Sequence, residues 1–97
     1  MNTKTEEVKK WARDLREDEP RPPETKLGGF PLAARCLDKC RASLLGWQGE
    51  YQYGCPMDQE FLEMAGISKE EFAGYVATGA SDSEVDRWLR LHAHARA

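Results

Sequence analysis

The chain has 97 residues, of which 40% are hydrophobic and 32% are charged. This length fits one domain with a thin core, so we expect residues 1–97 to form a single helical domain. The formal net charge of −3 gives no general attraction to nucleic acid or to an anionic membrane, and we expect neither as a partner. The longest run without a charge, residues 72–81, is far shorter than the ~20 apolar residues that cross a membrane. Residues 1–10 are polar and lack the apolar segment of a secretory signal, which predicts a cytoplasmic protein.

The first predicted helix covers residues 5–17, because apolar side chains recur there at helical spacing. Residues 18–29 contain three prolines and a glycine pair, which predicts an extended arm that wraps the domain. A loose linker is the alternative, and residues 1–17 would then be peripheral. The apolar stripe consists of Val8, Trp11, Ala12 and Leu15.

The second helix is predicted to begin near Pro31, which suits a first turn, and to run to Leu45 before Gly46 ends it. Arg41 falls at the margin of its apolar face, where a half-buried guanidinium would need an acidic partner. The apolar face consists of Ala33, Cys36, Leu37, Cys40 and Leu44, and the opposite face of Arg35, Asp38, Lys39 and Ala42.

Residues 46–54 are predicted to be a short extended segment, because Tyr51 and Tyr53 alternate with polar residues and would share one face. The third helix is predicted to start at Cys55 and Pro56 and to end at Gly66.

Capping boxes mark the two remaining helices. Ser68 and Glu71 start the fourth, which is predicted to end near Thr78, and Ser81 and Glu84 start the fifth. The sequence therefore predicts an all-α fold, a compact bundle of about five short helices with a proline-rich arm and one short extended loop.

The cysteines Cys36, Cys40 and Cys55 are odd in number, which argues against a closed disulfide framework and favours reduced thiols. Their spacing does not match the usual zinc sites, and neither does that of His92 and His94. We therefore expect no metal site and no cofactor.

Reactive side chains are densest between Asp38 and Asp58. The first functional hypothesis is a small-ligand-binding or regulatory module that uses this region. Basic side chains would hold a small anionic ligand, and aromatic side chains would flank it. The candidate binding residues are Asp38, Lys39, Arg41, Tyr51 and Tyr53.

The second hypothesis is a small enzyme. Cys55 would cap the third helix, where the helix dipole and backbone N–H groups favour a thiolate nucleophile; a buried, inert cap is the alternative. Glu50 and Asp58 are candidates for a catalytic acid and base. Alternatively, these carboxylates only neutralise Lys39, Arg41 and the helix N-terminus.

The third hypothesis is a homodimeric protein–protein adaptor. Three tryptophans in a chain with a thin core favour some of them lying at an interface.

A set of residues that spans about Leu15 to Trp88 resembles a bacterial family of small proteins, domain of unknown function 5069. The resemblance implies that the reactive positions between Asp38 and Asp58 belong to the family's signature, whereas Cys36 and Cys40 do not. It implies no activity. The residues that carry it are Gly28, Gly29, Arg35, Asp38, Lys39, Arg41, Ala42, Gly46, Gly49, Glu50, Tyr51, Tyr53, Cys55, Pro56 and Asp58, followed by Ser81, Asp82, Glu84, Val85 and Trp88.

Overall fold

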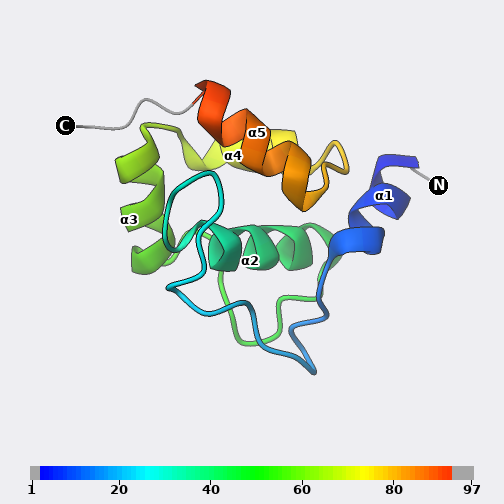
Figure 1. The fold of residues 1–97 in the computed structure, drawn as a ribbon. Helices are drawn as coiled ribbons and strands as arrows, with labels where there is room; N and C mark the ends of the chain where they lie inside the picture. Colours follow the sequence, from blue (N-terminus) through cyan, green and yellow to red (C-terminus); the bar gives the residue numbers. More distant parts are fainter. Residues whose placement is uncertain (1–2, 93–97) are drawn as a thin grey trace.

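The computed structural model describes residues 3–92, and within that range it contains five α-helices and no β-strand (Figure 1). The predicted all-α bundle of five short helices is confirmed. None of the helices in this range is long and apolar enough to span a membrane. The helices are α1 (Thr3–Trp11), α2 (Ala33–Leu45), α3 (Pro56–Ala65), α4 (Lys69–Val76) and α5 (Asp82–His92).

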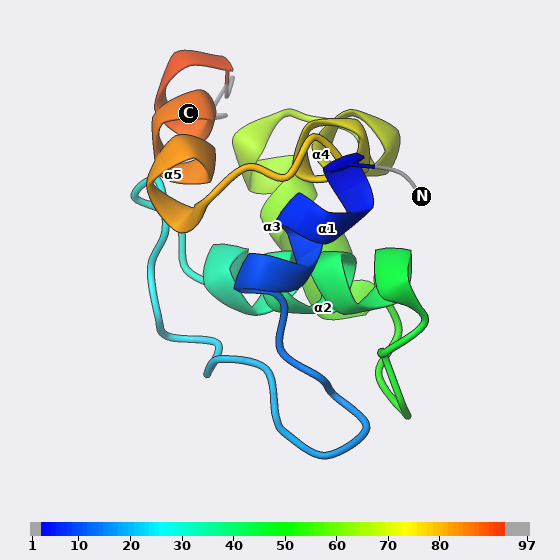
Figure 2. The same cartoon turned by 90° about the vertical axis from the view of Figure 1, so that its right-hand side faces the viewer.

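The central helix is α2, with α4 and α5 on one side of it and α1 and α3 toward its opposite ends (Figures 1 and 2). The predicted apolar face of α2 is buried except for Leu44, and most of the opposite face is buried as well. Asp38 and Lys39 are buried together with the apolar residues, whereas Leu44 is 44% exposed. The reason is that α2 is surrounded, so its polar face also lies against protein.

The second helix begins two residues later than predicted from Pro31, because Leu32 adopts a left-handed conformation with φ 71°. Its N–H donates to the Pro23 carbonyl oxygen at 2.8 Å, so the arm fixes the point where the helix starts. At the other end Gly46 has φ 73° and caps the helix, as predicted.

The first helix ends at Trp11 and not at Glu17. Asp14 stops it from continuing: its carboxylate accepts from the Arg16 N–H at 3.1 Å and forms a tight turn. Val8 and Leu15 of the predicted stripe are buried, but Trp11 is 43% exposed.

The proline-rich arm is held against the domain, which favours the ordered arm over the loose linker. The Gly28 N–H donates to Asp86 Oδ2 of α5 at 2.8 Å. Gly28 has φ 62°, and a Cβ there would lie 2.6 Å from the Leu89 Cβ. Only glycine therefore allows the arm to approach α5 this closely.

Both predicted capping boxes are present. The Glu71 N–H donates to Ser68 Oγ at 2.9 Å, and the Ser68 N–H donates to Glu71 Oε1 at 2.9 Å. Ser81 and Glu84 form the same reciprocal pair at the start of α5. These ends were predictable because a capping box is complete within four residues.

The fourth helix ends at Val76, two residues before the predicted Thr78. Its C-cap is Ala77 in a right-handed conformation, and Gly79 follows in a separate turn. The close approach of α1 explains that glycine, because a Cβ at Gly79 would lie 2.3 Å from the Glu7 Cβ.

Aromatic contacts join the helices around α2. Phe61 of α3 contacts Phe72 of α4 edge-on, with ring centroids 5.5 Å apart. Trp88 of α5 stacks on Tyr75 of α4 at 4.9 Å. These contacts and the apolar face of α2 form one core that holds the start of α3 against α2.

Candidate functional site around Cys55

Three polar side chains meet between α2 and the start of α3. Lys39 Nζ donates to Cys55 Sγ at 2.8 Å and lies 3.0 Å from Asp58 Oδ2. The side chains of Lys39 and Asp58 are only 4% and 2% exposed, whereas Cys55 is partly exposed. We call Lys39, Cys55 and Asp58 the Cys55 cluster. Cys55 is the least buried of these three residues.

The local sequence explains this placement. Pro56 occupies the first position of α3, and Cys55 is the N-cap with extended backbone, as predicted. The Cys55 side chain makes no capping hydrogen bond. Asp58 serves the turn instead, because its Oδ2 accepts from the Gly54 N–H at 2.8 Å. Cys55 Sγ therefore remains available to Lys39.

The turn before Cys55 is tight. Gly54 has φ 95°, and a Cβ there would lie 2.7 Å from Lys69 Cε. The Tyr53 hydroxyl donates to the Lys69 carbonyl oxygen at 2.7 Å, which ties the turn to the start of α4. Cys55 is thus held from three helices: α2 through Lys39, its own α3, and α4 through the preceding turn.

Lys39 is a cation within this cluster. Burial works to lower the pKa of Lys39, but its hydrogen bonds with Cys55 and Asp58 outweigh burial, and the pKa is raised above its ordinary value. A buried ammonium beside the sulfur at a helix N-terminus is the kind of environment that reactive cysteines share.

The other two thiols are buried, although Cys36 interacts with Asp58 of the Cys55 cluster. Cys36 and Cys40 are 0% and 1% exposed. Burial raises the pKa of Cys40 to about 12 and raises the pKa of Cys36 even further above its ordinary value. Both are therefore inert apolar core residues, and Cys55 is the accessible cysteine.

Two other charged residues of α2, Asp38 and Arg41, belong to a separate group. Arg21 of the arm donates to both oxygens of Asp38, at 2.9 and 3.0 Å, and to Asp82 Oδ2 at 2.7 Å. Arg41 donates to Asp82 Oδ1 and to the Ala80 carbonyl oxygen, both at 2.8 Å. We call Arg21, Asp38, Arg41 and Asp82 the arm cluster.

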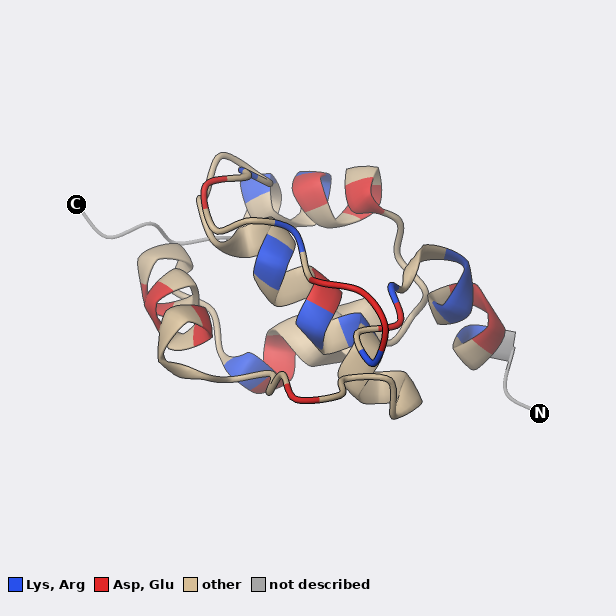
Figure 3. Cartoon of the chain, turned by 90° about the horizontal axis from the view of Figure 1, so that it is seen from below, with Lys and Arg blue, Asp and Glu red and all other residues tan. Residues whose placement is uncertain are grey.

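The arm cluster changes the predicted binding site. The acidic partner expected for Arg41 exists, but Arg41 is 2% exposed and not half-buried. Lys39 and Arg41 serve different clusters, and the charge of each is matched by a carboxylate. They do not converge on one anion. Figure 3 shows blue basic and red acidic segments close together on α2 and on the arm beside it.

Residues 46–54 form turns instead of the predicted extended segment, and the two tyrosines in it have different ring contacts. Tyr53 stacks on Phe72 with ring centroids 6.5 Å apart, while Tyr51 lies 5.8 Å from the Arg35 guanidinium carbon. Glu50 is exposed and lines, with both tyrosines, a shallow hollow of about 490 Å³. Asp58 does not line this hollow, so the predicted acid–base pair is not brought together there.

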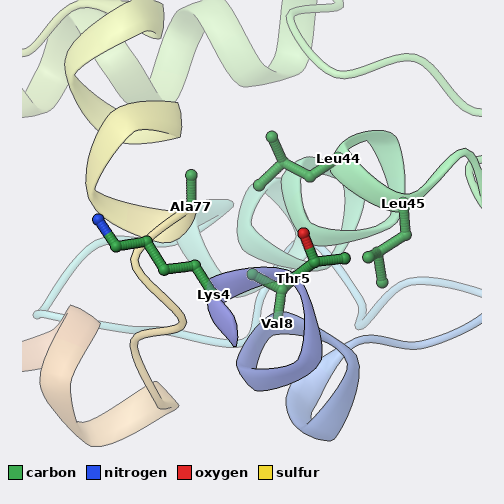
Figure 4. Close-up of a pocket in the computed structure, with 6 residues that line it drawn as sticks. All are labelled: Lys4, Thr5, Val8, Leu44, Leu45 and Ala77. Atoms are coloured by element: carbon green, nitrogen blue, oxygen red, sulfur yellow. The ribbon is translucent and has the colours of Figure 1, made fainter. Parts of the chain in front are cut away.

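Another hollow, of about 200 Å³, lies between α1, the end of α2 and the end of α4 (Figure 4). Its lining is mostly apolar and contains no cysteine, histidine or carboxylate. No group of three metal-ligating side chains occurs among residues 3–92. His94 lies outside the described residues.

Sequence reasoning missed Arg21, Asp82 and Lys69. Arg21 stands between prolines in a segment that has no periodicity, and its partners are 17 and 61 residues away. Asp82 belongs to the motif that carries the resemblance, and this was the available signal. Nothing local marks Lys69 as a neighbour of Gly54.

The fold and the site define a small all-α protein with one accessible, lysine-paired cysteine. Residues 17–97 match the family described as a domain of unknown function, DUF5069, and the chain belongs to that family. The matched range contains both clusters and begins after α1. A search of curated proteins gave no match.

Proposed function

We propose that this protein is a small thiol-based regulatory module in which Cys55 is the reacting group. The observation that carries the proposal is the 2.8 Å contact between Lys39 Nζ and Cys55 Sγ. A buried ammonium held by Asp58 stabilises negative charge on the sulfur that approaches it, and the thiolate is the nucleophilic form of cysteine. The substrate class is a small electrophile or oxidant that reaches a partly exposed thiol.

This proposal combines two of the hypotheses drawn from the sequence. Cys55 is the nucleophile, as in the enzyme hypothesis, and the role is regulatory, as in the ligand-binding hypothesis. The anion-binding version loses support, because Lys39 and Arg41 are both paired with carboxylates inside the fold. Removing a buried cation from such a partner to bind a ligand is costly. The reaction of Cys55 with an electrophile does not require an ion pair to separate first.

Alkylation of the native protein tests the proposal. Iodoacetamide should modify Cys55 about fivefold or more faster than it modifies a peptide that copies residues 53–59. Peptide mapping identifies the modified residue. Cys36 and Cys40 are internal controls, because their burial should protect them until the protein unfolds. A rate at Cys55 equal to that of the peptide would refute the proposal.

The hollow beside Tyr51 supports a second candidate, the binding of a polar small molecule. Its volume of about 490 Å³ falls within the usual range for such sites. Gln48 lines it, and the buried Gln48 Oε1 has no hydrogen-bond partner among the described residues. A ligand with a donor group would satisfy that oxygen.

Thermal-shift measurements with a panel of amines, amides and sugars test this second candidate. A ligand of this hollow should raise the melting temperature of the wild type and have little effect on Gln48→Ala. Equal shifts for both proteins would assign the binding to another place. The homodimeric adaptor and the cytoplasmic location stay predictions.

A further inference from the structure

The nitrogen of Lys39 and the sulfur of Cys55 face each other in the Cys55 cluster. Lys39 Nζ lies 2.8 Å from Cys55 Sγ and 3.0 Å from Asp58 Oδ2. The Lys39 side chain is 4% exposed, so it is confined beside the sulfur and does not sample solvent. If Cys55 Sγ became electrophilic, the Lys39 nitrogen would therefore be in contact with it before a thiol from another molecule could approach.

We propose that oxidation of Cys55 by a peroxide leads to a covalent sulfenamide bond between Cys55 Sγ and Lys39 Nζ. The inference rests on the reactivity of Cys55 proposed above, and it adds the regulation of that site: a reversible tie between α2 and the N-terminus of α3. The tie joins positions that are 16 residues apart in the sequence.

The chemistry balances in two steps. The thiolate sulfur attacks one peroxide oxygen, an S–O bond forms, the O–O bond breaks, and hydroxide leaves; the sulfur is oxidised by two electrons and the peroxide is reduced. The proton that the Lys39 ammonium releases converts this hydroxide to the first water. The lone pair of the Lys39 amine then attacks the sulfur of the sulfenic acid. An S–N bond forms, the S–O bond breaks, and the hydroxide leaves with a proton as a second water.

Asp58 supplies the proton acceptor that the second step requires. Lys39 must lose a proton before its nitrogen can attack, and Asp58 Oδ2 already contacts that nitrogen at 3.0 Å. Conversion of the thiolate to a neutral sulfenic acid also removes one of the two negative partners that stabilise the ammonium, and Asp58 remains as the other. Oxidation therefore prepares its own second step.

The other route for a sulfenic acid is a disulfide with a neighbouring thiol. Cys36 and Cys40 are buried in the core, and the sulfur that Lys39 contacts belongs to Cys55. Cys36 interacts with Asp58 of the same cluster, but Lys39 Nζ is the atom that contacts Cys55 Sγ, at 2.8 Å. This direct contact favours nitrogen over sulfur as the group that resolves the oxidised cysteine.

The experiment treats the full-length protein with one equivalent of hydrogen peroxide, blocks free thiols under denaturing conditions, and records intact mass and peptide maps. The expected product has lost two hydrogens and contains one linked peptide pair joining Lys39 to Cys55. Dithiothreitol should restore the starting mass. Cys36→Ala/Cys40→Ala, which cannot form an internal disulfide, should give the same link.

The Lys39→Arg variant separates the two steps. It keeps a cation beside the sulfur but lacks the amine, so its oxidation should stop at a sulfenic acid that dimedone traps. Circular dichroism checks that Lys39→Arg folds. If it does not fold, the link is still tested by Cys36→Ala/Cys40→Ala, which keeps Lys39 and Cys55.

Two results would overturn the link in different ways. Wild-type protein that accumulates a dimedone-reactive sulfenic acid, or a disulfide to Cys36 or Cys40, refutes the sulfenamide and leaves a reactive Cys55 in place. Wild-type protein in which peroxide does not modify Cys55 at all refutes the sulfenamide and the proposed function together.

Discussion

At the scale of single residues, the structure predicts opposite effects of alanine at two glycines, Gly74 and Gly49, because the space around them differs. Gly74 lies within α4, and a Cβ added there meets no atom within 4 Å. Gly74→Ala should therefore raise the free energy of unfolding by about 0.5–1 kcal/mol, because alanine loses less backbone entropy on folding. Urea denaturation monitored by circular dichroism measures the change.

Gly49 should respond in the opposite direction. It has φ 58°, and a Cβ there would lie 2.6 Å from the Leu15 carbonyl oxygen. Gly49→Ala should lower the free energy of unfolding by about 1–3 kcal/mol, because a backbone contact cannot rotate away. If the alanine variants of Gly49 and Gly74 had equal stability, the placement of the loop against Leu15 would be wrong.

The sequence alone does not separate these two glycines. Gly46 and Gly66 are predictable as helix ends, since each follows an apolar helical pattern. The need for glycine at position 49 arises from residue 15, which packs against it from a distant part of the chain. Such a requirement has no local signal.

At the scale of helices, the features that depend on neighbouring residues were predictable and those that depend on packing were not. The capping boxes of α4 and α5 are confirmed. The burial of Lys39 was not predicted, because a charged residue on a helix ordinarily faces solvent. Its partners lie on α3 and its N-cap, beyond the reach of helical periodicity.

The same long-range contacts limited the prediction of the site. Cys55 was identified because Pro56 marks a helix start, which is a local signal. Its partner Lys39 was included only as part of a predicted anion grip. On α2, Lys39 belongs to the Cys55 cluster and Arg41 to the arm cluster. The sequence does not reveal which carboxylate each of them contacts.

The link between α2 and α3 can be measured with a double-mutant cycle. Lys39→Met should lower the free energy of unfolding by about 3–5 kcal/mol, because Asp58 stays buried without its cation. Lys39→Met/Asp58→Asn should cost clearly less than the sum of the single variants, since the double change leaves no uncompensated charge. Purely additive costs would show that the two side chains do not interact.

At the scale of the whole molecule, the arm cluster joins segments that are far apart in the sequence. Arg21 connects the arm to α2 through Asp38 and to α5 through Asp82, and Arg41 contacts Asp82 from α2. All of these residues lie within the range that matches the family. Because the cluster ties the arm to both α2 and α5, its loss should affect the whole fold.

The pH dependence of stability should report on this cluster. Burial works to raise the pKa of Asp82, but hydrogen bonds from Arg21 and Arg41 outweigh it and hold the pKa below its ordinary value of 3.8. A carboxyl group whose pKa is lowered by folding contributes its stability in full above its unfolded-state pKa. That contribution is lost as the pH falls through the folded-state pKa. The free energy of unfolding should thus fall below about pH 4.

Asp82→Asn isolates that contribution. At neutral pH the variant should be less stable than the wild type by about 1–3 kcal/mol; the half-exposed carboxylate limits the loss, while the buried Arg41 that remains unpaired adds to it. The difference should shrink as the pH falls below about 4 and through the folded-state pKa, because the wild-type carboxylate becomes protonated there. Ser83→Ala, on the same turn of α5, removes no titrating group and should keep the wild-type slope. Urea denaturation across this pH range measures the slope of the free energy of unfolding against pH. If that slope were as steep in Asp82→Asn as in the wild type, acid would not destabilise the protein through the arm cluster.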